Sequence, residues 1–307
     1  MTIRVAIVGL GKIARDQHLP AIAGTDGIEL AAIVSRNAAL PDVPSFGDLE
    51  ALFAADVAVD AVALCTPPQV RRSQAAAALG AGKHVMLEKP PGASVREIAP
   101  LIETADGQGL SLFATWHSRF APAVETARAL LAQRSLRSVR IEWREDVRVW
   151  HPGQAWIFEP GGLGVFDPGI NALSILTRIL PKPPFVTSAR LDFPSNKGAP
   201  IAAEISFSDA GGLPIRAEFD FLQTGPQTWD ITVETDAGDV ALSEGGARLR
   251  DAGRELPVGP EAEYRGLYTR FVELIGEGRS EVDLTPLQLV ADAFLLGARR
   301  VVDAFEE

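Results

Sequence analysis

Apolar and polar positions alternate in two different ways along the 307 residues of the chain. Up to about residue 120, short apolar runs are separated by longer stretches of helix-forming residues. The apolar runs, expected as buried strands, are Ile3–Val8, Leu30–Ser35, Ala61–Cys65, His84–Leu87 and Ser111–Ala114. Helices are expected between them over Lys12–Ala23, Leu49–Ala54, Arg71–Gly80 and Ser94–Ala105. Strands that alternate with helices predict βαβ units and a parallel, doubly wound sheet.

The second part of the chain follows a different pattern. In residues 139–144 apolar and charged side chains alternate strictly, as they do in a strand with one buried face. Further strands are expected over Phe185–Phe193, Ile201–Phe207, Pro214–Leu222, Trp229–Thr235 and Val240–Ser243. Short glycine-containing turns between several of these runs favour a largely antiparallel sheet. Helices are expected after Asp167, near Tyr264–Gly276 and over Pro286–Phe305.

The change of pattern predicts an α/β chain of two domains. Residues 1–120 are expected to form the doubly wound domain. Residues 121–307 are expected to form an α+β domain with a large open, mainly antiparallel sheet, which carries the substrate and oligomer contacts. The C-terminal helix is expected to return to the first domain. An open sheet with one uncovered face is compatible with a homodimer.

Composition narrows the class of protein. The net charge is −11 and no run of Lys or Arg occurs, which argues against a nucleic-acid-binding protein, because such a protein normally carries a basic stripe. No stretch reaches about 18 uninterrupted apolar residues, so no membrane span is expected. The one cysteine, Cys65, cannot form an internal disulfide and suits a reducing compartment. A cytoplasmic protein is the simplest expectation.

The loop after the first strand carries a nucleotide-binding pattern. It reads Gly9-Leu-Gly11-Lys12-Ile13-Ala14, a G-x-G-x-x-A sequence that opens a helix. Gly9 permits a tight turn, Gly11 lets a pyrophosphate approach the backbone, and Ala14 permits close packing of helix and strand. The amides at the helix N-terminus can then hold the diphosphate. A merely tight structural turn is the alternative.

The end of the second strand bears on the choice of cofactor. An NAD-specific site usually has an acid about 20 residues after the glycine loop, where it binds the ribose diol. Here the strand ends in Ser35-Arg36-Asn37, with no acid. A hydroxyl and a guanidinium can accept a 2′-phosphate. NADP is therefore expected to bind, with NAD as a further candidate, unless Arg36 is only a solvated loop residue.

Residues 85–94, "VMLEKPPGAS", place a lysine directly after a buried strand. Chemistry on such a sheet lies beyond the carboxyl ends of its strands. Pro90 and Pro91 fix the backbone around Lys89, and the Lys89–Pro90 peptide is a candidate for the cis form. A lysine near the nicotinamide can hydrogen-bond a reacting oxygen and move its proton. The alternative is a surface lysine paired with Glu88.

These motifs occur together with "CTPP" at 65–68, "WHSRF" at 116–120 and "GGLGVFDPGIN" at 161–171. Their order resembles the glucose–fructose oxidoreductase/inositol dehydrogenase family over nearly the whole chain. The resemblance implies a Rossmann domain, a C-terminal open-sheet domain and hydride transfer at a sugar or polyol carbon. It makes Lys89 the catalytic lysine. The expected cofactor-binding residues are Gly9, Gly11, Lys12, Ile13, Ser35, Arg36, Cys65, Thr66, Pro67, Pro68, Glu88 and Lys89.

The second motif departs from that family at one position. Many members carry Asp and His four residues apart, with His as the base, whereas this chain has Asp167 and Asn171. This spacing puts both on one helical face, but an amide cannot take up a proton. Proton removal is left to Lys89 or Asp167, and both stay open. Asp167 with Pro168 also forms a good pair of N-cap and first helical residues, so it could simply start a helix.

A polar and aromatic shell is expected around the sugar. Indole rings stack on the apolar faces of pyranoses, and polar groups bind the hydroxyls. The residues expected to bind substrate are Lys89, His117, Glu145, Trp150, His151, Asp167, Asn171 and Trp229. Trp143 is expected in the core, His18 on a helix surface and His84 beside a strand. No metal site is expected, because no spacing typical of metal ligands occurs.

Asn171 and the stretches "TWHSRFAPAV" and "WREDVRVWHPGQAWIFEP" resemble the aldose 1-dehydrogenase branch of that family. The resemblance implies an NAD(P)-dependent enzyme that oxidises the anomeric carbon of D-galactose or L-arabinose to the aldonolactone. Lys89 and Asp167 would manage the hydroxyl proton, and Asn171 and His117 would orient the ring. One alternative is an inositol or polyol dehydrogenase. The other, from a different class, is a sensor that binds NAD(P) and sugar without turnover.

Overall fold

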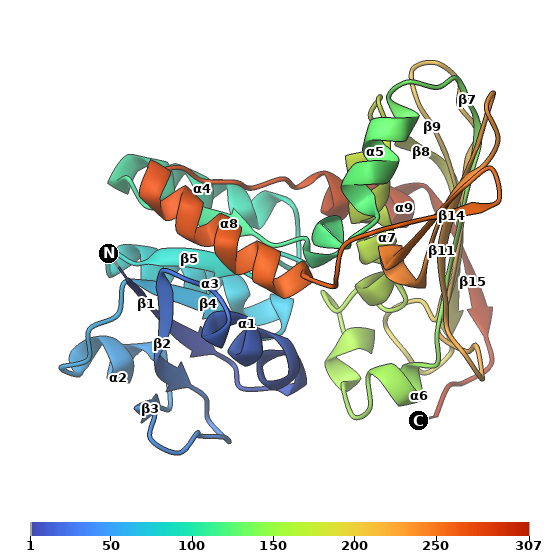
Figure 1. Ribbon diagram of the computed structural model, residues 1–307. Helices are drawn as coiled ribbons and strands as arrows, with labels where there is room; N and C mark the ends of the chain where they lie inside the picture. Colours follow the sequence, from blue (N-terminus) through green and yellow to red (C-terminus); the bar gives the residue numbers. More distant parts are fainter. Residues whose placement is uncertain (1, 307) are drawn as a thin grey trace. The chain divides into compact units, whose positions relative to one another are not determined.

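The computed structural model describes residues 2–306, and its chain divides into two compact units (Figure 1). Unit 1 contains the chain up to Trp116 together with Tyr264–Leu284. Unit 2 contains His117–Glu263 together with the chain from Thr285 onward. The segment that returns to unit 1 is therefore α8 and its continuation. The sequence predicted that the C-terminal helix would return to the first domain, but that helix belongs to unit 2.

Unit 1 is built on a parallel sheet of strand order β3-β2-β1-β4-β5-β6. Its strands are β1 Ile3–Val8, β2 Ile28–Val34, β3 Ser45–Phe46, β4 Ala61–Leu64, β5 His84–Leu87 and β6 Leu112–Ala114. Its helices are η1 Ala14–His18, α1 Leu19–Ala23, α2 Leu49–Ala54, α3 Pro68–Gly80, η2 Arg96–Ile98, α4 Ala99–Gln108 and α8 Glu263–Glu277. The doubly wound sheet predicted from the alternating pattern is confirmed.

Helix α8 completes the core of unit 1. Its residues Tyr264, Leu267, Tyr268, Phe271 and Leu274 are buried, which is the stripe expected of a helix with one apolar face. The Phe271 ring stacks on Phe113 of β6, with ring centroids 6.2 Å apart. The chain after α8 then pairs beside β6, where the amide of Glu281 donates to Leu112. Residues far apart in sequence thus share one core.

Unit 2 is built on a mixed, mostly antiparallel sheet of order β14-β13-β12-β11-β7-β10-β9-β8-β15. Its strands are β7 Leu136–Arg144, β8 Phe185–Pro194, β9 Ala202–Ser208, β10 Ile215–Asp220, β11 Thr228–Thr235, β12 Val240–Ser243, β13 Arg248–Asp251, β14 Arg254–Leu256 and β15 Gly297–Val302. Its helices are η3 His117–Phe120, α5 Val124–Leu131, α6 Val147–Trp150, η4 Ala155–Phe158, α7 Phe166–Ile179, η5 Glu244–Gly246 and α9 Thr285–Leu296. The predicted open, mainly antiparallel sheet is confirmed.

Helices α5, α7 and α9 cover one face of this sheet (Figure 1). The opposite face carries charged side chains, because β7, β9 and β10 alternate buried and exposed positions. A row of acidic residues crosses this face, in which Asp230 of β11 pairs with Glu142 of β7, and Glu218 of β10 lies between Glu142 and Glu204 of β9. Arginines partly neutralise the negative charge of this row. Arg144, for example, forms ion pairs with both Glu142 and Glu218.

The end of the chain corrects one prediction. The helix expected over Pro286–Phe305 stops at Leu296, and Gly297–Val302 forms β15, which pairs in parallel with β8. Gly297 has no room for a side chain, because a Cβ there would lie 2.5 Å from the carbonyl oxygen of Ala293. The Arg300 guanidinium then bonds the Asp192 carboxylate at 2.8 Å across the two strands. Tertiary pairing therefore overrides the helical pattern.

Among the described residues, no helix is long and apolar enough to cross a membrane.

Candidate active site

The glycine-rich loop follows β1 as expected and is shaped by contact with the loop after β4. Gly9 has φ +92°, and a Cβ at Gly9 would lie 2.9 Å from the Thr66 side chain, so only glycine fits. Nothing lies within 4 Å of a Cβ built on Gly11, which leaves space above the loop for a phosphate group. Lys12 and Ile13 are exposed at the start of the helix. The loop therefore fits the diphosphate of a dinucleotide.

The helix after this loop departs from ideal α geometry. Residues 14–18 form a π turn before α1 begins at Leu19. Such turns are often found at functional sites, because they turn side chains out of the regular α-helical register. Here the turn ends at His18, which is fully buried rather than on the helix surface as the sequence pattern suggested. The prediction of a surface His18 is wrong, because its partners come from segments far away in sequence.

Ser35 and Arg36 lie directly after β2 and next to the glycine loop. The amide of Gly9 donates to the carbonyl of Val34 at 2.8 Å, which fixes the end of β2 beside this loop. Ser35 is half-buried and Arg36 is exposed. A hydroxyl and a guanidinium are thus available where the adenosine ribose of a dinucleotide binds in this fold.

The loops after β4 and β5 are joined by a buried arginine. Arg71 of α3 is 4% exposed, and its Nε donates to the carbonyl of Thr66 at 2.9 Å. The same guanidinium donates to the carbonyls of Glu88 and Pro90. This role could not be predicted from the sequence, where Arg71 has the pattern of an ordinary first-turn residue of a helix.

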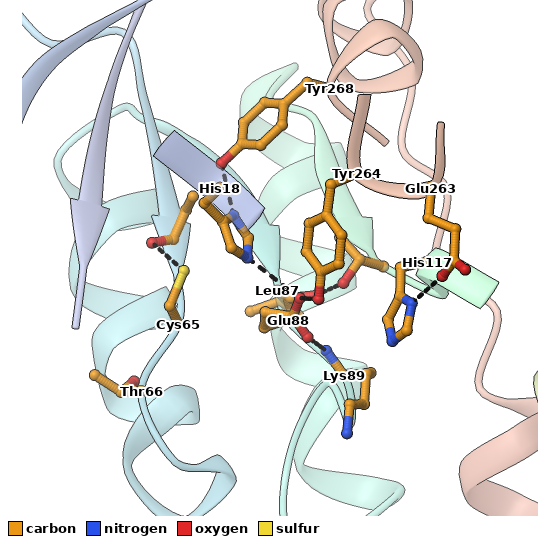
Figure 2. A network of polar contacts seen from close by, with 12 residues as sticks. His18, Cys65, Thr66, Leu87, Glu88, Lys89, His117, Glu263, Tyr264 and Tyr268 are labelled. Carbon is orange, nitrogen blue, oxygen red and sulfur yellow. Dashed lines mark hydrogen bonds and ion pairs between the residues drawn. The ribbon is translucent and has the colours of Figure 1, made fainter. Parts of the chain in front are cut away.

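Lys89 follows β5, and its peptide bond to Pro90 is cis, which confirms that part of the prediction. Lys89 is half-buried. Its neighbour Glu88 is 3% exposed and turns its carboxylate into the protein, towards His18 and Tyr264, as Figure 2 shows. The Glu88 side chain is thus occupied by protein partners, and its predicted contact with the cofactor stays a prediction.

His18 lies at the centre of a buried polar network. Its Nε2 is 3.2 Å from Glu88 Oε1 and its Nδ1 is 2.7 Å from the Tyr268 hydroxyl (Figure 2). Burial alone would lower the pKa of His18, but Cys65, Tyr268 and Glu88 together raise this pKa well above its usual range. Burial also raises the pKa of Tyr268 to about 12, so this residue stays a neutral phenol. His18 thus lies between the Glu88 carboxylate and the Tyr268 hydroxyl, with both ring nitrogens engaged.

Cys65 and the two prolines after it also lie where the sequence placed them. Cys65 and Thr66 are half-buried after β4, and Pro68 is the first residue of α3, with Pro67 before it. Cys65 carries no disulfide. The Thr66 hydroxyl bonds the Gln74 side chain at 2.5 Å, which keeps this loop against α3.

In unit 2, four predicted residues form one chain of contacts. Glu145 is 2% exposed and accepts hydrogen bonds from Trp229 Nε1 and His151 Nε2, both at 2.9 Å. Because a carboxylate only accepts, His151 Nε2 carries the hydrogen. His151 Nδ1 then lies 3.9 Å from Asp167 Oδ2. The structure therefore places an imidazole between two carboxylates.

Asp167 lies inside α7 and not at its N-cap. The helix starts at Phe166 with Val165 as N-cap, and Asp167 is 4% exposed in the first turn. The N-cap alternative is therefore wrong. The "GGLG" sequence before the helix explains this placement, because Gly164 has φ +57° and a Cβ there would lie 2.2 Å from a backbone oxygen of Pro200. This tight turn thus places Asp167 on the side of α7 that faces His151.

Asn171 lies four residues further along α7, on the same helical face as Asp167, as the spacing predicted. Its side chain is half-buried. Trp150 and Trp229 form an aromatic pair with ring centroids 4.7 Å apart, and Trp150 is 38% exposed. Trp143 stacks behind Trp229 and is 4% exposed, which confirms it as a core residue. An indole face and several polar groups are therefore gathered in unit 2.

His117 begins η3, and its Nδ1 lies 2.5 Å from Glu263 Oε2 (Figure 2). His117 was predicted from the sequence, whereas Glu263, Tyr264 and Tyr268 were not. A signal for the tyrosines existed, because two tyrosines four residues apart share one face of a predicted helix. Their partners His18 and Glu88 are remote in sequence and gave no local signal.

None of the described residues forms a cluster of three or more His, Cys, Asp or Glu side chains that would suit a metal ion. The doubly wound sheet, the glycine loop and the lysine after β5 define a dinucleotide-binding oxidoreductase. Comparison with known proteins agrees with this class. Residues 3–115 match the profile of the Gfo/Idh/MocA oxidoreductase family with its NAD-binding Rossmann fold.

Two of the relatives that match nearly the whole chain are galactose 1-dehydrogenases. The galactose 1-dehydrogenase of Pseudomonas fluorescens is 48% identical over 305 residues, which cover 99% of this chain and 98% of the relative. The crystal structure of a D-galactose-1-dehydrogenase protein from Rhizobium etli has 57% identity and a TM-score of 0.95, with 99% and 98% of the two chains covered. This chain therefore belongs to the Gfo/Idh/MocA family of oxidoreductases.

A more distant structure shares the fold. The 3-ketoreductase from Actinomadura kijaniata, solved with NADP and TDP-benzene, has 18% identity and a TM-score of 0.85 over 98% of this chain and all of the other. The predicted NAD-binding oxidoreductase is confirmed by the family.

Proposed function

We propose that this protein is an NAD(P)-dependent sugar 1-dehydrogenase that oxidises D-galactose at its anomeric carbon to the aldonolactone. The observation that supports this most is the similarity to galactose 1-dehydrogenases over 98–99% of each chain. L-Arabinose is a second substrate of the proposal, because it lacks only the exocyclic hydroxymethyl group of D-galactose. One such group contributes about 1–3 kcal/mol to discrimination.

The bound nicotinamide supplies the hydride acceptor of the reaction. Gly9, Gly11, Lys12 and Ile13 are proposed to hold its diphosphate, for which the open space above Gly11 gives room. Lys89 and Asp167 are assigned to the proton of the anomeric hydroxyl. Further predicted cofactor contacts are Cys65, Thr66, Pro67, Pro68 and Glu88.

His151 supplies the imidazole that position 171 lacks in this chain. Its Nε2 donates to Glu145, so its Nδ1 is the nitrogen that can receive a proton from Asp167, 3.9 Å away. We propose that proton transfer from the sugar passes through Asp167 to His151. Asn171 and His117 orient the ring hydroxyls, and Trp150 and Trp229 bind its apolar face.

We further propose that NADP is accepted alongside NAD. Ser35 and Arg36 follow β2, whose last carbonyl binds the glycine loop, and no acid stands there to repel a 2′-phosphate. Arg36→Ala is expected to weaken NADP binding about 10- to 100-fold, since a hydrogen bond to a charged group contributes about 1.5–3 kcal/mol. NAD binding should change little, and Arg72→Ala on the exposed side of α3 serves as the control.

The decisive test follows reduced-nicotinamide absorbance with D-galactose, L-arabinose, D-glucose and myo-inositol, each with NAD and NADP. Lys89→Met should abolish turnover, whereas Lys83→Met should not, because Lys83 precedes the amino end of the same strand β5. Turnover of D-galactose supports the proposal. Turnover of inositol alone would refute the sugar assignment and favour a polyol dehydrogenase. Cofactor binding without any turnover would favour the sensor alternative.

Three broader expectations stay predictions beside this proposal. They are a homodimer, a cytoplasmic location and a substrate domain formed by the second part of the chain. Size-exclusion chromatography with light scattering measures the first of them directly.

A further inference from the structure

The backbone of Lys89 is held from one side by the carboxylate of Glu88. Glu88 Oε2 accepts the Lys89 amide at 2.5 Å. Glu88 Oε1 accepts the Tyr264 hydroxyl at 2.8 Å and faces His18 Nε2 at 3.2 Å (Figure 2). Both carboxylate oxygens are therefore engaged, and one of them fixes the peptide that carries the lysine.

The other side of the same peptide is held by Arg71. Its guanidinium donates to the carbonyls of Glu88 and Pro90, the residues immediately before and after Lys89. The Lys89–Pro90 bond is cis. The Lys89 amide and the carbonyls of Glu88 and Pro90 are thus each bonded to a buried charged side chain.

This arrangement exceeds what stability alone requires. Burying charged groups costs desolvation energy, and well-packed apolar side chains would stabilise a core as well or better. Here charged and hydroxyl groups from η1, α3 and α8 converge on one short segment after β5. A fully satisfied polar network fixes one geometry, because each partner must keep its hydrogen bonds.

We propose that Glu88, His18, Tyr264 and Arg71 are positioning residues that hold the backbone of Lys89 in the one orientation its chemistry needs. The inference rests on the proposed function, which assigns Lys89 to the anomeric hydroxyl. A reacting group displaced by about 1 Å loses about 100-fold in rate. A substitution in the network therefore lowers kcat by displacing Lys89, although Lys89 itself is unchanged.

The test compares Glu88→Gln and Tyr264→Phe with Ser111→Ala. Ser111 is fully buried in the same unit, and its hydroxyl donates to the carbonyl of Leu274 on α8 at 3.2 Å, so Ser111→Ala removes a buried hydroxyl contact to the same helix. Measurements are kcat and KM for D-galactose, the thermal midpoint, and hydrogen–deuterium exchange of a peptide covering residues 85–94. Tyr264→Phe is the milder variant and guards against misfolding of Glu88→Gln.

Both network variants should lose at least tenfold in kcat with KM changed less than threefold, and residues 85–94 should exchange faster. Ser111→Ala should keep kcat within twofold. Wild-type kcat in a folded Glu88→Gln or Tyr264→Phe variant would overturn the inference. So would an equal loss in Ser111→Ala at equal thermal midpoint.

Failure of the proposed function is recognised separately. If Lys89→Met keeps full turnover, or the wild-type protein turns over no sugar, the assignment of Lys89 is wrong. In that case, the hydrogen–deuterium exchange data alone test whether the network holds the backbone of residues 85–94. Unchanged exchange of residues 85–94 in both variants overturns the positioning role, and faster exchange supports it.

Discussion

Replacing Arg71 by methionine tests whether the loops after β4 and β5 depend on one buried guanidinium. Arg71 is 4% exposed and donates to the carbonyls of Thr66, Glu88 and Pro90. A buried acceptor left without a partner costs about 1–3 kcal/mol, so three of them give about 3–9 kcal/mol before the loops relax. We expect a loss of about 3–5 kcal/mol in the free energy of unfolding, the lower part of that range, because the loops can relax around the carbonyls.

The assay is urea denaturation followed by circular dichroism, with the slope of free energy against urea as a check on the folded state. The matched control is Arg72→Met, because Arg72 is the next residue on α3 and is exposed. That control should stay within about 0.5 kcal/mol of the wild type. If Arg71→Met lost no more stability than Arg72→Met, the hydrogen bonds of Arg71 would not stabilise these loops and the reasoning would fail.

Three further predictions use other parts of the chain. Gly9→Ala should weaken cofactor binding about 10- to 100-fold, measured by fluorescence titration, because φ +92° strains alanine by about 1–3 kcal/mol and its Cβ would meet Thr66 at 2.9 Å. Trp229→Phe should raise KM for D-galactose about tenfold while kcat changes less, since it removes the indole N–H that orients a buried carboxylate; an unchanged KM would contradict this. Asp230→Asn should stabilise the protein at pH 7 by about 0.2–1 kcal/mol, because burial and then Glu142 raise the pKa of Asp230 and like charges face each other across β11 and β7.

The sign of the Asp230 effect follows from proton linkage. A carboxyl group whose pKa is raised on folding binds protons more tightly in the folded state, so its ionised form costs stability above that pKa. The advantage of Asp230→Asn should therefore shrink as the pH falls through the folded pKa of Asp230. Thermal midpoints at pH 7 and pH 4 measure it, and an advantage that grew towards acid pH would contradict the argument.

Local pattern was enough to predict most of the fold. The strands of unit 1 are mostly continuous apolar runs and most of those of unit 2 alternate, so the type of each sheet could be predicted from the sequence. Strand β15 could not, because Leu295 and Leu296 continue a helical pattern and only pairing with β8 makes the following residues extended. The short strand β3, Ser45–Phe46, was missed because its two residues give no periodic signal.

The residues of the candidate site likewise fall into those that a local motif predicts and those that depend on partners far away in sequence. Gly9, Lys89 and Asp167 lie in motifs with their own local geometry, and the structure places them in that geometry. His18 was misassigned because its burial depends on Tyr268, which is 250 residues away. Short-range pattern cannot reveal a partner at that separation, although it can show that a tyrosine lies on the buried face of its helix.

The return of α8 to unit 1 has a consequence for how the chain folds during synthesis. The ribosome releases residues 2–116 long before Tyr264–Leu284, so the first sheet emerges without the helix that covers His18, Glu88 and Phe113. Contacts of such long separation form late and leave apolar surface open until then. The first unit is therefore finished only after most of the second has been made. A fragment that ends at residue 120 would keep that surface exposed, and aggregation would be its expected fate.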